Sequence, residues 1–244
     1  MTVGSMQMSL AQPINTISAT KKHKLGMLYV DALGRKYRYA KAGATALAAG
    51  ELTAAPAVTA HHKDASVAAA TPIGATTVSV TVGATAVTAD YYADGYLQVN
   101  DGTGEGHCYA IAGNSACDAS TTTVVKLYEP IRVALVASAT SEVTLVPSPY
   151  SGTVISATPE AFCTGVTPLV VTAAYYYWTQ TGGPCVCLAG GNAIAVGSQI
   201  ILGGTDGSYD VVATSSDVDV PKIGYQFGIA SVTGEYQPIY LQID

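Results

Sequence analysis

A short alternating run occupies residues 74–80, Gly74-Ala75-Thr76-Thr77-Val78-Ser79-Val80, and a second Gly-led run follows at residues 83–88. From Thr71 onward apolar and polar residues alternate, which predicts short, half-buried β-strands. Further strands are expected at residues 95–99, 107–111, 122–127, 131–135 and 142–146. Short strands at regular spacing, separated by Gly- and Pro-containing turns, indicate a β-sandwich or barrel.

The same style continues after the break Pro147-Ser148-Pro149. Strands are expected there at residues 169–171, 175–180, 185–188, 199–202, 210–213, 223–230 and 236–243. Pairs of glycines between these runs are typical of turns. We therefore predict two small antiparallel β-sandwich or barrel modules, the first at residues 61–147 and the second at residues 148–244.

Residues 1–60 differ from the rest and are predicted to form a basic N-terminal arm and a β-hairpin. Residues 1–24 are polar and irregular, which is typical of a segment that orders against a partner. Residues 25–39 alternate around the turn Asp31-Ala32-Leu33-Gly34, and this pattern predicts a hairpin. Residues 40–52 are rich in alanine and could form two turns of helix, although Gly43 and Gly50 oppose a helix.

The composition favours an all-β fold. Charged residues make up only 11% of the chain, and Tyr reaches 16 residues against 2 Phe. Thr and Val, which are frequent here, suit a pleated sheet, whereas the usual residues of long helices are scarce. Because few charges protect the surface, a chain of this kind is expected in an assembly that covers its sheet edges and apolar patches.

The basic residues are concentrated at one end of the chain. Eight of the eleven Lys and Arg residues lie within the first 63 positions, together with only Asp31 and Glu51, so this stretch carries a net charge of +6. The remaining residues carry −12. This asymmetry indicates that the leading segment binds something acidic while the body faces solvent.

No set of residues indicates catalysis, a cofactor or a metal. The adjacent His107 and Cys108 would point to opposite faces of a strand and cannot form a dyad. A cation at Asp94, Asp101 and Glu105 lacks the EF-hand spacing, and zinc at Cys185-x-Cys187 with Cys163 or His61-His62 lacks a second half-site. Nucleic-acid binding is disfavoured because the acidic body would repel phosphates.

No signal peptide or membrane span is evident from the sequence. The five cysteines are odd in number and lack a framework spacing, which favours reduced thiols in a protein made in the cytosol.

Several segments resemble structural proteins of tailed bacteriophages. They are Lys36–Gly43, Tyr92–Ile111, Lys126–Leu135, Val143–Tyr150 and Tyr176–Pro184. The resemblance implies a virion protein of the capsid decoration (cement) type, which sits as a homotrimer on the outer face of the head and bridges major capsid subunits. It implies localisation to the outer capsid surface after synthesis in the host cytoplasm, and it carries over no catalytic residue.

Charge and aromatic placement then give candidate contacts. The basic residues expected to face the capsid are Lys21, Lys22, Lys24, Arg35, Arg38 and Lys41. The aromatic residues expected to pack between subunits are Tyr175, Tyr177 and Trp178. The expected partners are the major capsid protein and two further copies of this chain, with no nucleic acid, membrane or cofactor. One alternative is a head-fibre or tail module that binds host glycans through Trp178, and another is a polysaccharide depolymerase.

Overall fold

The structure is a computed structural model that describes residues 10–191, 193–212 and 220–244. It is all-β, as predicted, and within the described residues the only helix is a single 3₁₀ turn, η1 (Ala60–His62). The chain divides into two compact units, Ala57–Ser148 and a second unit made of Met1–Pro56 with Pro149–Asp244. Each unit is described by itself below.

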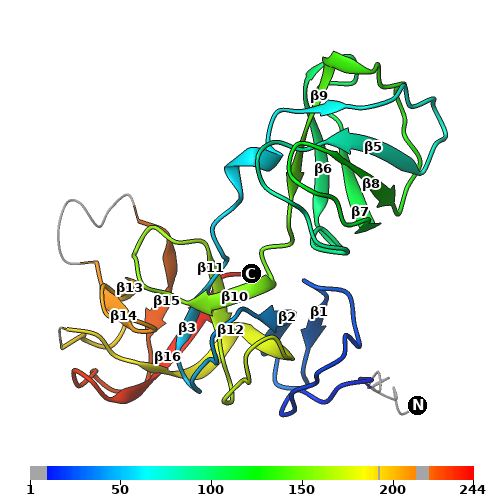
Figure 1. Cartoon of the computed structure of the whole chain (residues 1–244). Coiled ribbons are helices and arrows are strands. Elements are labelled where there is room, and N and C mark those ends of the chain that lie inside the picture. Colours follow the sequence, from blue (N-terminus) through cyan, green and yellow to red (C-terminus); the bar gives the residue numbers. More distant parts are fainter. Residues whose placement is uncertain (1–9, 192, 213–219) are drawn as a thin grey trace, which may run out of the picture. The chain divides into compact units, whose positions relative to one another are not determined.

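The unit at Ala57–Ser148 is a closed antiparallel barrel, seen in cyan and green in Figure 1. Its strands follow the order β4-β5-β8-β7-β6-β9 around the barrel. Their bounds are β4 Ala65–Val67, β5 Thr77–Thr81, β6 Tyr96–Gly102, β7 Cys108–Asn114, β8 Thr122–Leu127 and β9 Ser138–Val146. Alternation decides which side chains enter the barrel. In β8, for example, Thr123, Val125 and Leu127 are buried while their neighbours are exposed.

The larger unit contains one continuous sheet of ten strands. Their bounds are β1 Leu28–Val30, β2 Lys36–Ala42, β3 Leu52–Ala54, β10 Ser151–Ile155, β11 Cys163–Val166, β12 Tyr176–Leu188, β13 Gln199–Leu202, β14 Tyr209–Val211, β15 Lys222–Gln226 and β16 Tyr236–Gln242. The order is β1-β2-β10-β3-β11-β12-β16-β15-β13-β14, and an additional pairing of β2 with β12 closes β2, β10, β3, β11 and β12 into a ring. The β2–β10 pair is parallel, unlike the antiparallel pairing predicted from the sequence.

β12 joins the two parts of this sheet. Its first half, from Tyr176, pairs with β2, and its second half, to Leu188, pairs with β16. The strands predicted separately at residues 175–180 and 185–188 are therefore one strand of 13 residues. It continues through Gly182 and Gly183, which pair with Gln242 and Leu241 of β16. An added Cβ at either glycine would lie within 3.3 Å of Lys36 or Arg35.

An aromatic cluster lies where β2 pairs with the first half of β12. Tyr37, Tyr39 and Trp178 are buried together, and Leu10 and Ile14 of the N-terminal segment pack against them. The rings of Tyr39 and Trp178 meet edge to face with centroids 5.1 Å apart, a geometry that stabilises aromatic pairs beyond their buried area. A separate apolar core lies under β13, β15 and β16.

The N-terminal segment from Leu10 onward is ordered on its own unit. Gln12 is buried, its side-chain nitrogen donates to the Tyr176 carbonyl (3.0 Å), and its side-chain oxygen accepts from the Tyr39 hydroxyl (2.6 Å). The Gln12 carbonyl also accepts from Trp178 Nε1 at 2.9 Å. The prediction of an arm that orders only against a partner thus differs from the structure for residues 10–24, while residues 1–9 lie outside the described residues.

The observed division places residues 1–60 differently from the predicted linear order. Rather than preceding two modules, residues 28–54 supply β1, β2 and β3 to the unit that contains residues 149–244. The physical reason is the backbone of β2, which finds its hydrogen-bond partners in β10 and β12. The barrel at Ala57–Ser148 covers the first predicted module.

A repeated loop pairing, which we call a loop clasp, closes strand ladders in both units. In each clasp two loops exchange a reciprocal pair of backbone hydrogen bonds of 2.9–3.0 Å between their central residues. The central pairs are Leu47–Val171, Thr71–Leu135 and Val87–Cys117. Residues 83–88, 131–135 and 169–171 are predicted as strands but contribute to clasps instead. Of the alanine-rich residues 40–52, which could form a short helix, the first three belong to β2, the last begins β3, and Leu47 lies in a clasp. Their single bridges do not extend into ladders.

Each clasp turns through a left-handed residue three positions after a central residue. These residues are Gly50, Gly74, Asp90, Ser120 and Ala174, with φ between 57° and 89°. Each donates its backbone N–H across the clasp, as in the bond from Ala174 to the Gly43 carbonyl at 2.8 Å. At Gly50 a Cβ atom would lie 2.8 Å from the Tyr236 ring, so glycine is required there for space as well as for φ.

Replacing Gln12 by alanine should destabilise the larger unit. The substitution removes the acceptor of the Tyr39 hydroxyl and one of the two donors to the Tyr176 carbonyl, which keeps the Ser18 N–H. The free energy of unfolding is therefore expected to fall by about 1–3 kcal/mol. Urea unfolding monitored by Trp178 fluorescence measures this change. Asn15→Ala, an exposed substitution in the same segment, should change it by less than about 0.5 kcal/mol. Equal stability of the two variants would contradict the docking of this segment.

Ala174→Gly should stabilise the protein relative to Ala173→Gly. Both substitutions add the same freedom to the unfolded chain, but only Ala174 has a positive φ, at 63°. Because a left-handed alanine is strained, the difference in unfolding free energy should favour Ala174→Gly by about 1 kcal/mol. Thermal and urea unfolding of the matched pair provide the measurement, and a difference of opposite sign would refute the clasp geometry.

Candidate functional site

The six basic candidates all lie in the larger unit but in two different settings. Lys21, Lys22 and Lys24 are exposed on the segment that leads into the hairpin. This segment is fastened to the aromatic cluster, since the Lys22 backbone N–H donates to the Tyr39 hydroxyl at 3.1 Å. The three ammonium groups are therefore carried by an ordered part of the surface, which we call the lysine segment.

The other three candidates make contacts within their own unit. Arg35 pairs with Asp31 across the β1–β2 hairpin at 2.7 Å. Arg38 donates to the Asp244 carboxylate at 2.8 Å and to the Gly26 carbonyl at 2.7 Å. Lys41 places its ammonium group 5.5 Å from the centre of the Tyr176 ring. These half-buried side chains hold the hairpin and β2 in place.

The Asp31 carboxylate is an organising group of the hairpin turn. It accepts from Arg35 Nε and from the backbone N–H groups of Leu33 and Arg35, both at 2.9 Å. Burial alone would raise the pKa of Asp31, but the hydrogen bonds from Arg35 and Leu33 outweigh it and lower the pKa below 3.8. The turn therefore depends on an ionised Asp31.

Two of the three aromatic candidates for subunit packing are fully buried. Tyr177 hydrogen-bonds Thr153 Oγ1 at 2.9 Å, and burial raises the pKa of Tyr177 to about 12. Trp178 is covered by the N-terminal segment and offers no surface to a sugar or to a second subunit. Tyr175 is half-buried against the Ala40–Leu47 region. The prediction is corrected here because Tyr177 packs in the cluster with Ala40, Leu47 and Val171, while the N-terminal segment covers Trp178.

Exposed apolar side chains gather instead around the second half of β12. Val186, Tyr236 and Tyr240 of β12 and β16 are 54%, 50% and 41% exposed, and Phe227, just after β15, is 47% exposed. Phe227 and Tyr240 meet edge to face with ring centroids 6.2 Å apart. We call this set the β12–β16 apolar surface. Sequence reasoning missed it because these residues are spread over three segments.

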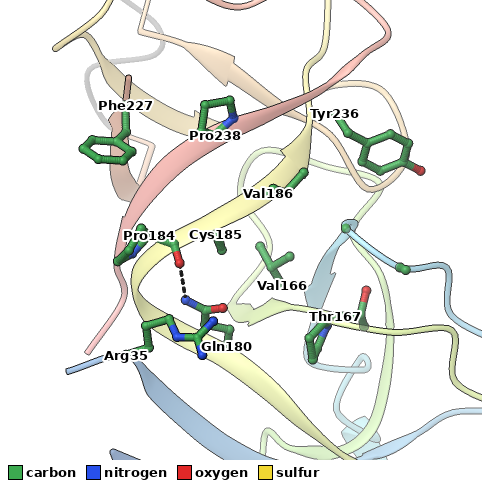
Figure 2. Close-up of a pocket in the computed structure, with 13 residues that line it drawn as sticks. Arg35, Val166, Thr167, Gln180, Pro184, Cys185, Val186, Phe227, Tyr236 and Pro238 are labelled. Carbon is green, nitrogen blue, oxygen red and sulfur yellow. Dashed lines mark hydrogen bonds between the residues drawn. The ribbon is translucent and has the colours of Figure 1, made fainter. Parts of the chain in front are cut away.

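A groove of about 610 Å³ lies beside this surface (Figure 2). It is bordered by the residues Arg35, Ala49, Gly50, Val166, Thr167, Pro168, Gln180, Pro184, Cys185, Val186, Phe227, Tyr236 and Pro238. Most of these side chains are apolar, and polar groups of Arg35 and Gln180 lie near one another at one end. Its volume lies within the range of ligand-binding clefts.

Gln180 shows how the polar end of the groove is built. Its side chain is only 4% exposed, and its Nε2 donates to the carbonyls of Gly182 (3.1 Å) and Pro184 (2.9 Å). Its Oε1 has no hydrogen-bond partner among the described residues. This amide oxygen is an acceptor available to a bound molecule.

Three of the five thiols and two of the four histidines take structural positions. Burial raises the pKa of Cys163 to about 12 and also raises the pKa values of Cys185 and Cys187, which share the apolar core of the larger unit. His107 Nδ1 lies 3.0 Å from the Gly104 carbonyl, and buried His62 contacts the Tyr92 hydroxyl and the Thr85 carbonyl. In the described ranges, no three His, Cys, Asp or Glu residues gather as a metal site.

Comparisons with known proteins give no relative. No known family matches the chain, and neither the curated proteins nor the solved structures contain a match. Across the described residues, no helix has the length and apolar character needed to cross a membrane.

The Asp31 geometry predicts how stability depends on pH. Because its pKa is lower in the folded state, its contribution is fully present above the ordinary value of 3.8 and is lost as pH falls through the folded value. The stability advantage of the native chain over Asp31→Asn should therefore be constant above about pH 5 and shrink below about pH 4. Urea unfolding across this range tests it. Asn15→Ala, an exposed substitution that removes no carboxylate, serves as the control, and its difference from the native chain should not vary with pH.

Proposed function

We propose that this chain is a structural protein of a tailed-bacteriophage virion that binds the outer surface of the head and bridges major capsid subunits. In this proposal it performs no catalysis, is made in the host cytoplasm and acts on the capsid surface as a homotrimer. The resemblance of five segments to virion proteins motivates the proposal, and the surface of the larger unit supports it.

The observation that carries the proposal is the lysine segment. Lys21, Lys22 and Lys24 are exposed, and Gln12, Tyr39 and Trp178 hold the segment on the unit. Ordered cationic side chains lose less entropy on binding than those of a free arm. Charges of this kind speed docking on an acidic surface and fix its register.

Low charge and exposed apolar area fit an assembled protein. The β12–β16 apolar surface leaves several large side chains about half exposed, and contiguous apolar surface of this kind marks sites of protein association. Subunit or capsid contacts are accordingly proposed here and not at Tyr177 or Trp178. Several modest contacts in each trimer would then act together, so the lattice gains more stability than one contact provides.

The alternative function, binding of host glycans, requires a sugar to contact Trp178. That side chain is fully buried, and its indole nitrogen is engaged by the Gln12 carbonyl. A sugar therefore has no access to this ring in the folded unit.

Neutralising the lysine segment should weaken attachment to the capsid. The variant Lys21→Gln, Lys22→Gln, Lys24→Gln is expected to bind purified heads that lack this protein about tenfold more weakly, with a smaller dependence on salt. Co-sedimentation with heads at several salt concentrations measures the affinity.

The matched control removes the same charge elsewhere. Lys126→Gln, Arg132→Gln, Lys222→Gln neutralises the three basic residues outside the first 63 positions, all of which are exposed. It should bind heads as the native chain does. Equal losses in both variants would indicate a general charge effect, and native affinity in the first variant would overturn the role of the lysine segment. Absence of binding by the native chain would overturn the proposed function itself.

A further inference from the structure

The groove beside β12 lies at a gap in the sheet. β11 and β16 occupy opposite edges of β12, and the β11 pairing reaches Gln180 through Val166. After Val166 the chain turns away, with the Thr167 N–H donating to Glu51. On that edge the next backbone contact is from the Leu188 N–H to the Gly50 carbonyl, at 2.9 Å. Within the described residues, the intervening part of β12 has no neighbouring strand on this edge.

Two prolines determine which backbone groups of β12 face the gap. In an antiparallel pair, residues alternate between pairs that exchange hydrogen bonds and pairs that do not. Pro184 faces Tyr240, and Val186 faces Pro238, so neither pair can exchange two N–H···O bonds. The backbone groups of Pro184, Val186 and Leu188 consequently point away from β16 and toward the groove.

Two observed hydrogen bonds agree with this assignment. The Pro184 carbonyl accepts from Gln180 Nε2, and the Leu188 N–H donates to Gly50. Val186 lies between them, and by the same alternation its N–H and C=O face the groove and not Pro238. Outside the strand ladders, neither group has a backbone hydrogen bond within the described residues. An unpaired donor and acceptor of one residue therefore border the groove, in the arrangement that an additional strand requires.

The remaining groups of the groove extend this strand-like site. Gln180 Oε1 offers a nearly buried acceptor, and the terminal nitrogens of Arg35 offer donors while its Nε is held by Asp31. Figure 2 shows Val166 on one side of the groove and Tyr236 with Pro238 on another. Polar groups for a peptide backbone are thus combined with apolar walls for its side chains.

We infer that the groove beside β12 binds an extended peptide segment of a partner protein, which adds a short strand along Val186. The segment is uncharged at its centre and carries apolar side chains that pack against Val166, Tyr236 and Pro238. Main-chain hydrogen bonds give such strand addition its affinity, and the pockets for side chains give specificity. The inference rests on the proposed function for one point, that the partner is the major capsid subunit.

The geometry also limits the length of the added strand. Pro184 has no N–H, and the Leu188 N–H already bonds to Gly50, so the available edge centres on Val186. At about 3.3 Å per residue, a segment of roughly three to five residues spans the gap. A short edge of this kind accepts one peptide and does not promote open-ended sheet growth.

A random library of eight-residue peptides, selected on the purified full chain, tests the inference. Recovered peptides should alternate apolar and uncharged residues. Their affinity should fall at least tenfold for Val186→Pro, which removes the N–H that faces the groove without removing a bond to β16. Val186→Thr keeps the N–H and the branched shape, and it should bind within about threefold of the native chain.

A second measurement does not depend on the folding of a variant. N-methylation of a recovered peptide at each amide in turn should abolish binding at the one or two positions that pair with Val186 and should be tolerated elsewhere. Failure to recover any peptide, equal binding by Val186→Pro, or uniform tolerance of N-methylation would overturn the inference.

Binding to heads separates this inference from the proposed function. If the native chain and Val186→Pro bind heads equally, the inference fails while the proposed function stands. If recovered peptides bind as described but the native chain does not bind heads, the groove is a peptide site and the capsid assignment fails.

Discussion

The backbone hydrogen bonds of β12 are the constraint on which the larger unit depends. One strand of 13 residues closes a ring with β2 and β11 through its first half and supports β16 and the strands beyond it through its second half. The chain has few charges and few large aliphatic side chains for its size, so continuous ladders must satisfy the buried polar groups. At Val186, where β12 lacks a neighbouring strand on one edge, the backbone can pair with an added peptide strand.

The loop clasps pair backbone groups that lie beyond the ends of the strands. Loops between strands carry backbone groups that need partners, and here two loops satisfy each other with a reciprocal pair of hydrogen bonds. The tetrapeptide Gly-Ala-Thr-Ala occurs at residues 43–46 and again at residues 83–86, each time just before a central clasp residue, so one local sequence serves both units. The left-handed residue that follows five of the six central residues turns the chain and directs a further N–H to the partner loop.

Packing also changes the meaning of the charge asymmetry. Among the eight basic residues of the leading segment, Arg35 and Arg38 pair with carboxylates of their own unit. Lys21, Lys22 and Lys24 lie exposed on an ordered segment of the same unit. Electrostatic attraction and apolar contact are then properties of the same unit, because the β12–β16 apolar surface belongs to it as well.

The sequence by itself determined the all-β class, the β1–β2 hairpin and the strands whose alternation is strong, such as Thr122–Leu127 and Gln199–Leu202, which the structure reproduces at their predicted bounds. These features depend on residues that are close together in the sequence, so the local pattern of apolar and polar residues is sufficient to predict them. Only the tertiary structure decided that β2 joins β12, that Trp178 is buried under Gln12, and that Val186 and Tyr236 border one groove. Each depends on strands far apart in the chain, whose pairing is set by the hydrogen-bond partners that the whole sheet leaves available. A periodic pattern records which residues alternate, but it does not record which strand will lie beside them.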